Sequence, residues 1–192
     1  MNLFLWGALP YIAFTFLIVG TLVRFFYFER NWTTKSSQFL EKKQLRIANP
    51  LFHFGLLCVI GGHVVGVLIP KTWTAAIGIN DHMYHQGALY MGAVAGIIFI
   101  VGFLLLMKRR FTVPAMKVNT SGLDKWLYLF LTLAIFSGMA GTLLNASGFF
   151  DYRVSIGPWF RSLISFMPDP SLMEGVPFMF KFHMLAWMVV AI

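Results

Sequence analysis

The chain alternates between long apolar segments and short polar ones, and this pattern predicts membrane-spanning helices. Four segments of about 20 residues contain no Lys, Arg, Asp or Glu, which is the length that crosses a ~30 Å hydrocarbon core. A fifth apolar segment is shorter and ends with the printed sequence. The predicted helices cover residues 3–23, 51–69, 87–107, 126–146 and 178–192.

These segments predict an all-α integral membrane protein, a five-transmembrane-helix bundle whose last helix is truncated. Residues 1–192 then form a single membrane domain. The last segment has 15 residues, about 22 Å of helix, which is short for a complete span. Residues 156–167, which are rich in aromatic and aliphatic side chains, fit a short helix on the outer surface or an ordinary loop equally well.

Basic residues gather in two polar segments and orient the bundle. Cytoplasmic loops carry an excess of Lys and Arg, so we expect both segments on the cytoplasmic side of the cell membrane and the N-terminus outside. The basic residues of these two segments are Arg24, Arg30, Lys35, Lys42, Lys43, Arg46, Lys108, Arg109, Arg110, Lys117 and Lys125.

Composition excludes several classes of protein. Hydrophobic residues make up 58% of the chain and charged residues 11%, against about 25% charged in soluble domains. A soluble enzyme and a disordered tail are therefore excluded. The net charge of +8 is explained by the cytoplasmic loops, so membrane lipid and not nucleic acid is the expected partner. The single cysteine, Cys58, excludes a disulfide framework.

Three of the five histidines lie inside predicted membrane helices, where an ionisable side chain is costly and usually functional. His63 lies about 10 Å from the outer end of its helix, and His183 lies about 7–8 Å from the same side on another helix. Two imidazoles at similar depths fit the two axial ligands of one haem. His53 lies about 15 Å further in and fits a second haem. No Cys-x-x-Cys-His sequence is present, so the haem would be bound noncovalently, as b-type haem.

Glycines accompany these histidines. They leave room beside a ligand helix for a flat macrocycle, or they allow close helix packing of the Gly-xxx-Gly kind, and both interpretations stay open at this point. The glycines concerned are Gly61, Gly62, Gly66, Gly87, Gly92, Gly96, Gly102, Gly138 and Gly141.

The sequence resembles the gamma, or cytochrome b, subunit of respiratory nitrate reductase. The two-histidine helix carries the most specific part, with NPLFHFG at residues 49–55, GHVVG at 62–66 and IPKTW at 69–73. Further matches are TKSS at 34–37, EKK at 41–43, KRR at 108–110 and FKFH at 180–183. Two further stretches, DHMYH at 81–85 and SIGPWFR at 155–161, look like versions from Gram-positive bacteria.

The resemblance implies a five-helix anchor with two b haems, which oxidises a quinol such as menaquinol near the outer face and passes electrons inward. It implies a cytoplasmic iron–sulfur beta subunit as the electron acceptor and a molybdenum alpha subunit that reduces nitrate. The chain would therefore be the quinol-oxidising subunit of a quinol:nitrate oxidoreductase complex.

The resemblance also implies roles for the histidines. His63 and His183 would bind the iron of the outer haem, and His53 would bind the iron of the inner haem. In the family pattern the partner of His53 lies about eighteen residues after His183, on the same helix face. The printed sequence ends at Ile192, before that position, so the inner haem site is expected to be incomplete in it.

Further residues are candidates for the haem propionates and for quinol. The anionic propionates would pair with Arg109 and Arg110, although these arginines could equally serve only to set the topology. Quinol oxidation releases two protons, so its site needs an acceptor near the outer haem. His85 and Gln86 lie on the expected side, and His82 is a weaker candidate.

Three other kinds of protein are alternatives to this prediction. A transporter would show an inverted repeat or paired half-helices, and the sequence shows neither. A redox-silent anchor would not need histidines matched in depth on two helices. A haem b subunit that serves a related complex, with a sulfite- or heterodisulfide-type acceptor, is the strongest alternative, because the acceptor sits on another chain.

Overall fold

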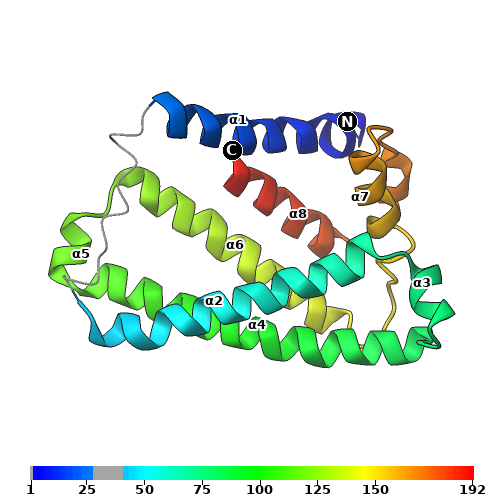
Figure 1. The fold of residues 1–192 in the computed structure, drawn as a ribbon, viewed down its shortest axis with the longest axis horizontal. Coiled ribbons are helices and arrows are strands. Elements are labelled where there is room, and N and C mark those ends of the chain that lie inside the picture. Colours follow the sequence, from blue (N-terminus) through cyan, green and yellow to red (C-terminus); the bar gives the residue numbers. More distant parts are fainter. Residues whose placement is uncertain (1, 28–40) are drawn as a thin grey trace.

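The computed structural model describes residues 2–27 and 41–192, and every regular element in these ranges is helical, which confirms the all-α prediction. Arg30, Lys35 and the TKSS stretch at residues 34–37 lie outside the described residues. The elements in Figure 1 are η1 (Phe4–Ala8), α1 (Leu9–Tyr27), α2 (Lys43–His63), η4 (Val64–Leu68), α3 (Lys71–Ala76), α4 (Asp81–Thr112), α5 (Pro114–Val118), α6 (Gly122–Leu144), α7 (Ile156–Ile164), η5 (Pro170–Met173) and α8 (Phe178–Ala191).

Four helices in the described part of the chain are long and apolar enough to cross a membrane. Their bounds are Phe4–Tyr27, Lys43–Leu68, Asp81–Thr112 and Gly122–Leu144, and they cover the first four predicted segments to within one or two residues at the ends that fall short. The fifth apolar segment forms α8, whose 14 residues give about 21 Å of helix and do not span a ~30 Å core. The count of five membrane-spanning helices therefore stays a prediction.

The helices extend beyond the apolar segments that predicted them. Helix α2 begins at Lys43 rather than near residue 51 and runs through Pro50. Helix α4 begins at Asp81, because the side chain of Asn80 accepts a hydrogen bond from the backbone N–H of Met83 at 2.9 Å and caps the first turn. His85 and Gln86, expected at the mouth of a helix, thus lie within α4 itself.

The helices form two packed pairs. Helix α2 packs along α4, and α6 packs along α8, while contacts between the pairs are fewer. In Figure 1, α1 lies along the outside of α8, and α6 and α8 lie between α1 and α2. The short helix α5 lies at one end of the bundle, called the α5 end below, and α3 and α7 lie at the other, the α7 end.

Two glycines allow α2 and α4 to pack closely. A Cβ on Gly55 would lie 2.5 Å from the backbone nitrogen of Phe99, and a Cβ on Gly102 would overlap the backbone of Phe52. At these two positions only a hydrogen leaves room for the facing backbone. The close approach of α2 and α4 therefore explains why glycine occupies positions 55 and 102.

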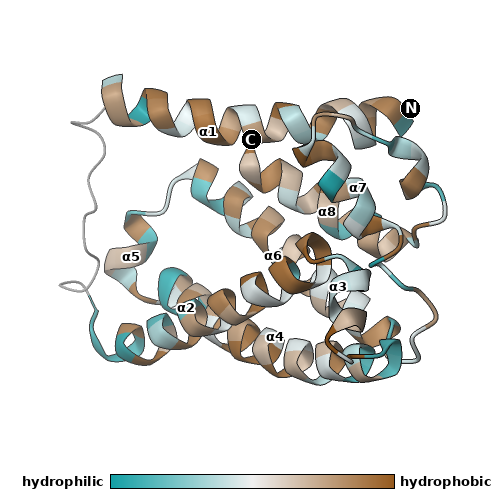
Figure 2. Cartoon of the chain, turned by 45° about the vertical axis from the view of Figure 1, so that its right-hand side comes forward, coloured by the Kyte–Doolittle hydropathy of each residue, from teal (hydrophilic) through white to brown (hydrophobic). Residues whose placement is uncertain are grey.

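The stretch that fitted a helix or a loop equally well forms a helix, α7. Its apolar side packs on the start of the chain, where the rings of Trp159 and Trp6 meet edge to face at 5.8 Å and the indole N–H of Trp159 donates to the carbonyl of Trp6 at 2.8 Å. Hydrophilic residues gather mainly toward the ends of the long helices, and hydrophobic residues fill their middles, as Figure 2 shows. This distribution is that of helices which cross a bilayer.

Candidate functional site

His63 and His183 face each other across the space between the two helix pairs. Their ring centroids lie 6.0 Å apart, and the planes differ by 30°. His63 is the last residue of α2, and His183 lies in the second turn of α8. Two metal–imidazole bonds of about 2 Å each, with half a ring on either side, add up to roughly this spacing. The pair predicted from matching depths is thus brought together.

His53, His63 and His183 are held by the same ring nitrogen, and in the described part of the chain the other nitrogen of each ring has no hydrogen-bond partner. The Nδ1–H of His53 donates to the carbonyl of Asn49 at 2.9 Å, and that of His63 donates to the carbonyl of Val59 at 2.8 Å. These two acceptors are the carbonyls four residues earlier on the same helix. Because a carbonyl only accepts, each Nδ1 carries the proton and each Nε2 keeps its lone pair available for a metal.

The imidazole of His183 is held in the same way by a different helix. Its Nδ1–H donates to the carbonyl of Ala134 on α6 at 2.8 Å, and the hydroxyl of Ser137 lies 3.3 Å from the same nitrogen. A Cβ on Gly138 would lie 2.7 Å from Cε1 of this ring. Helix α6 therefore both aims the His183 ring and leaves room for it.

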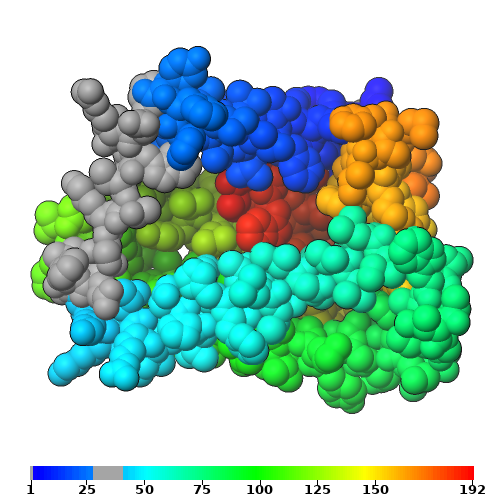
Figure 3. Space-filling view, in the orientation of Figure 1, coloured from blue at the N-terminus to red at the C-terminus, as the bar shows by residue number. Residues whose placement is uncertain are grey.

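The ligand candidates on α2 line an open space. His53 and His63 are exposed, although both lie in a membrane-spanning helix. A Cβ on Gly61 or Gly62 would meet nothing within 4 Å. The space-filling view in Figure 3 shows this face hollowed between α1 and α2, with α8 set back behind them. Of the two interpretations of the glycines, room for a bulky group fits Gly61 and Gly62, whereas Gly138 makes room for the His183 ring itself.

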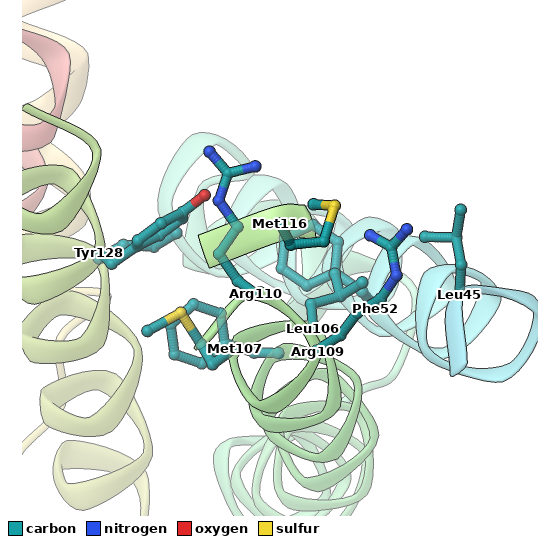
Figure 4. Close-up of a pocket in the computed structure, with 10 residues that line it drawn as sticks. Leu45, Phe52, Leu106, Met107, Arg109, Arg110, Met116 and Tyr128 are labelled. Carbon is teal, nitrogen blue, oxygen red and sulfur yellow. The ribbon is translucent and has the colours of Figure 1, made fainter. Parts of the chain in front are cut away.

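A cavity of about 230 Å³ lies toward the α5 end, between α2, α4, α5 and α6. In Figure 4, Arg110 lies between the ring of Tyr128 on one side and Phe52 and Leu45 on the other. The cavity thus combines an apolar lining with two guanidinium groups. Its lining residues are Leu45, Phe52, Phe103, Leu106, Met107, Arg109, Arg110, Met116, Tyr128 and Leu131.

Both arginines of this cavity also pair with carboxylates. The Nε of Arg109 lies 2.8 Å from a carboxylate oxygen of Glu41, and a second guanidinium nitrogen donates to the carbonyl of Glu41 at 2.8 Å. Arg110 pairs with Asp124 at 3.1 Å. The pKa of Glu41 lies below its ordinary value, first because the backbone N–H of Gln44 donates to it and then because Arg109 does.

His85 and Gln86, the predicted quinol residues, lie half-buried in α4 at the α7 end. The Nε2–H of His85 donates to the carbonyl of Ala146 at 3.2 Å, just after the end of α6. Gly148, at φ +72°, brings its backbone close to the same ring. This bond leaves Nδ1 of His85 as a hydrogen-bond acceptor. The neighbouring His82, the weaker candidate, is exposed.

Sequence reasoning missed a polar cluster at the α7 end. Arg153 is only 4% exposed, donates to the hydroxyl of Thr74 at 2.6 Å and stacks over the ring of Tyr84 at 3.7 Å. Tyr152 lies in the same cluster, and its burial, above all, raises the pKa of its hydroxyl. The scarcity of basic residues in this loop is the one sequence signal that could have singled out Arg153.

Arg161 joins the same end of the bundle. Its guanidinium donates to the carbonyl of Val67 in η4 at 2.7 Å. A Cβ on Gly157 would lie 3.1 Å from the donating nitrogen, so this glycine lets the guanidinium reach the carbonyl. Arg161 thereby ties α7 to the end of the helix that carries His63.

The sequence matches the family described as nitrate reductase gamma subunit over residues 2–192. It is 47% identical over 189 residues to the nitrate reductase gamma chain of Bacillus subtilis, which covers 98% of this chain and 85% of that relative. It is 28% identical over 190 residues to the respiratory nitrate reductase 1 gamma chain of Escherichia coli, covering 98% and 84%.

A third relative is a longer protein. The chain is 39% identical over 183 residues to the nitrate reductase-like protein NarX of Mycobacterium tuberculosis, covering 94% of this chain and 28% of that protein. The near-complete match to the family and the identity to the Bacillus subtilis relative both extend over the two-histidine helix and the helix that carries His183. This chain belongs to the nitrate reductase gamma subunit family.

Proposed function

We propose that this chain is the membrane cytochrome b subunit of a respiratory nitrate reductase. It oxidises a quinol near the α7 end and delivers the electrons to an iron–sulfur beta subunit on the cytoplasmic side, beyond the α5 end. A molybdenum alpha subunit then reduces nitrate. Family membership supports the complex, and the histidine pair supports the redox role.

The observation that carries this proposal is the pair of imidazoles at 6.0 Å with both Nε2 atoms free. His63 and His183 would hold one b haem, and His53 would supply one ligand of a second. When bound, the two haems would supply one-electron carriers at two depths in the membrane. The residues fit the group, because Gly138 makes room for one ring and the other faces open space.

The chain's own residues fix the ligands before any metal arrives. Each Nδ1–H is engaged by a backbone carbonyl, so the tautomer that binds iron is already selected. Arg109 and Arg110, at the cavity of the α5 end, would face the propionates of the inner haem. Arg110 pairs with Asp124 and keeps its Nε–H without a hydrogen-bond partner among the described residues, which leaves this N–H for that contact.

At the α7 end, His85 and Gln86 would bind quinol. Quinol loses two electrons and two protons, and the acceptor nitrogen Nδ1 of His85 would take a proton from a quinol hydroxyl. The backbone carbonyl of Ala146 engages Nε2 and holds the ring, so Nδ1 is the nitrogen left to face the quinol. Protons would leave on the outer side, while the electrons move inward.

The charges of the described residues support the orientation that we propose. The α5 end carries Lys42, Lys43, Arg46, Lys108, Arg109, Arg110, Lys117 and Lys125. An excess of basic residues in short loops marks the cytoplasmic face, so we place the α5 end inside and the α7 end, with the N-terminus, outside. This orientation puts quinol and nitrate reduction on opposite faces of the membrane.

The test is a reduced-minus-oxidised spectrum and a pyridine haemochrome assay on membranes that contain the assembled complex. We expect b-type haem that is extracted by acid acetone, because no covalent attachment sequence is present in the chain. Loss of one b-type signal in both His63→Ala and His183→Ala, with retention in His82→Ala, would support the assignment. Full haem content in His63→Ala would refute it.

The strongest alternative is a haem b subunit of a complex with another terminal acceptor. It is less well supported, because the matching relatives are named as nitrate reductase chains. Co-purification separates the two possibilities. A molybdenum subunit that reduces nitrate should copurify with this chain, whereas a partner that lacks nitrate reductase activity would favour the alternative.

A further inference from the structure

Two arginines of the α7 end lie around the part of the chain that directly follows His63, one in direct contact with it and one behind a tyrosine. Arg161 donates to the carbonyl of Val67, four residues after His63. Arg153 stacks over Tyr84, whose hydroxyl lies 3.3 Å from the position of a Cβ on Gly66, three residues after His63. One helical turn advances about 5.4 Å, so the carbonyl that Arg161 contacts lies about one turn beyond His63, and Tyr84 separates Arg153 from the same segment.

Neither arginine forms an ion pair with a carboxylate in the described ranges, 2–27 and 41–192. Two of the carboxylates at this end, Asp81 and Asp151, pair with Lys71 at 2.8 and 3.0 Å, and Asp151 also accepts the backbone N–H of Arg153. Asp169, a third, accepts the backbone N–H of Ser171. Asp81 and Asp151 are partly exposed, with side chains 67% and 40% accessible, whereas Arg153 is 4% exposed. Water and salt therefore screen the carboxylates much more than the arginine.

The burial of Arg153 also decides how it can act. A side chain that touches a group bound beside His63 would be reachable from the open space there. Arg153 is closed off from that space, and its Nε has almost no accessible surface and no hydrogen-bond partner among the residues that the structure describes. It therefore acts through its charge at a distance and not as a ligand of the bound group.

A purely structural role is the simpler explanation for each contact. Arg161 satisfies a carbonyl at a helix end, where a cation is favourable, and Arg153 ties the loop to α3 and α4. Such a role needs the hydrogen bonds and the stacking. It does not need two cations, and it predicts no effect on the redox properties of a group held by His63 and His183.

We propose that Arg153 and Arg161 form a fixed positive field that raises the reduction potential of the haem held by His63 and His183. This inference rests on the proposed function. Ferrous haem carries one positive charge less than ferric haem, so a nearby unscreened cation stabilises the reduced form. The field favours transfer of each electron from quinol to this end of the path, and quinol gives up two electrons and two protons in all.

The experiment is a spectroelectrochemical titration of the b haems in membranes that contain the assembled complex. We expect Arg153→Met and Arg161→Gln each to lower the midpoint potential of the outer haem, by a shift that corresponds to a severalfold to tenfold change in the equilibrium constant. The inner haem at His53 should keep its potential, because it lies about 15 Å further from these charges. It serves as the internal control.

Two further variants separate charge from structure. Arg153→Lys keeps the charge and changes the stacking, and Thr74→Val removes the hydrogen bond and keeps the charge. Both should leave the outer potential near that of the native complex. Arg161→Gln keeps a donor for the carbonyl of Val67, so it tests the charge even where Arg153→Met fails to assemble.

The outcomes are distinct. An unshifted outer potential in Arg161→Gln, or an equal fall in Thr74→Val and Arg153→Met, would overturn the inference and leave the proposed function intact. A native complex without a bis-histidine b-type signal would overturn the proposed function, and this inference with it. A lower outer-haem potential in Arg153→Met and Arg161→Gln, with a native potential in Arg153→Lys and Thr74→Val, would establish the field.

Discussion

Gly138 on α6 lies directly against the imidazole of His183 on α8. A Cβ at this position would come within 2.7 Å of Cε1 and 3.1 Å of Nδ1 of the ring. The same helix supplies the carbonyl of Ala134 that holds Nδ1–H. The backbone of α6 therefore determines both where the ring can lie and which nitrogen it presents.

Gly138→Ala should therefore displace the His183 ring and weaken the outer haem site. Insertion of a methyl group into such a contact costs about 1–3 kcal/mol, which is enough to shift or release an axial ligand. We expect loss or a high-spin shift of one b-type signal in the absorption and electron paramagnetic resonance spectra. Gly92→Ala is the matched control, because a Cβ there meets nothing within 4 Å. Equal spectra for the two variants would contradict this assignment.

Substitutions of the three proposed haem ligands should have different effects according to the depth of each histidine in the membrane. His63→Ala and His183→Ala should each abolish the outer haem signal and stop quinol oxidation. His53→Ala should leave that signal and interrupt electron delivery to the beta subunit, because it affects only the inner level. A redox titration that resolves the two haems measures their signals. The rate of nitrate reduction with a quinol analogue as electron donor measures electron delivery. Loss of the outer signal in His53→Ala, with the inner one retained, would show that the proposed orientation is inverted.

His85→Ala should slow quinol oxidation and spare both haems. The ring is held by the carbonyl of Ala146 and not by a residue of the histidine pair, so its removal should not release haem. We expect at least a tenfold fall in kcat with quinol, the range for loss of a general base. Electron delivery from an artificial donor that bypasses the quinol site should continue. His82→Ala, an exposed neighbour on α4, should have near-native rates.

The hydrogen bonds that Glu41 accepts, first from the backbone N–H of Gln44 and then from Arg109, should make stability depend on pH. The pKa of Glu41 lies below its ordinary value of 4.5, so its contribution is present in full above pH 4.5 and is lost as the pH falls through the lower folded value. Glu41→Gln should therefore reduce thermal stability in detergent at pH 7, and the difference from the native chain should vanish in acid. Glu174→Gln, at an exposed position, should show neither effect.

The membrane helices could be predicted from the sequence because about 20 apolar residues in a row have few other uses. Their ends could not, because the helices continue through polar residues such as Lys43 and Asp81 once they leave the apolar segment. A local cap, the side chain of Asn80, fixes one of these ends.

The histidines could be selected by residue type and depth, and the structure brings His63 and His183 together. The partner of the His183 Nδ1–H could not be predicted, because it is a backbone carbonyl of another helix. The roles of Gly138 and Arg153 also depend on contacts between elements far apart in sequence. Sequence periodicity carries no information about which loop folds back over a helix end.

The division of the bundle into two packed pairs has a consequence for biogenesis. His63 belongs to the pair α2 and α4, and His183 belongs to the pair α6 and α8, so an iron bound to both would cross-link two halves that otherwise touch less. Cofactor insertion then completes the assembly of the bundle as well as its redox chain. In cells starved of haem precursors, we expect the connection between α4 and α6 to become sensitive to protease, and supplied haem to restore its protection.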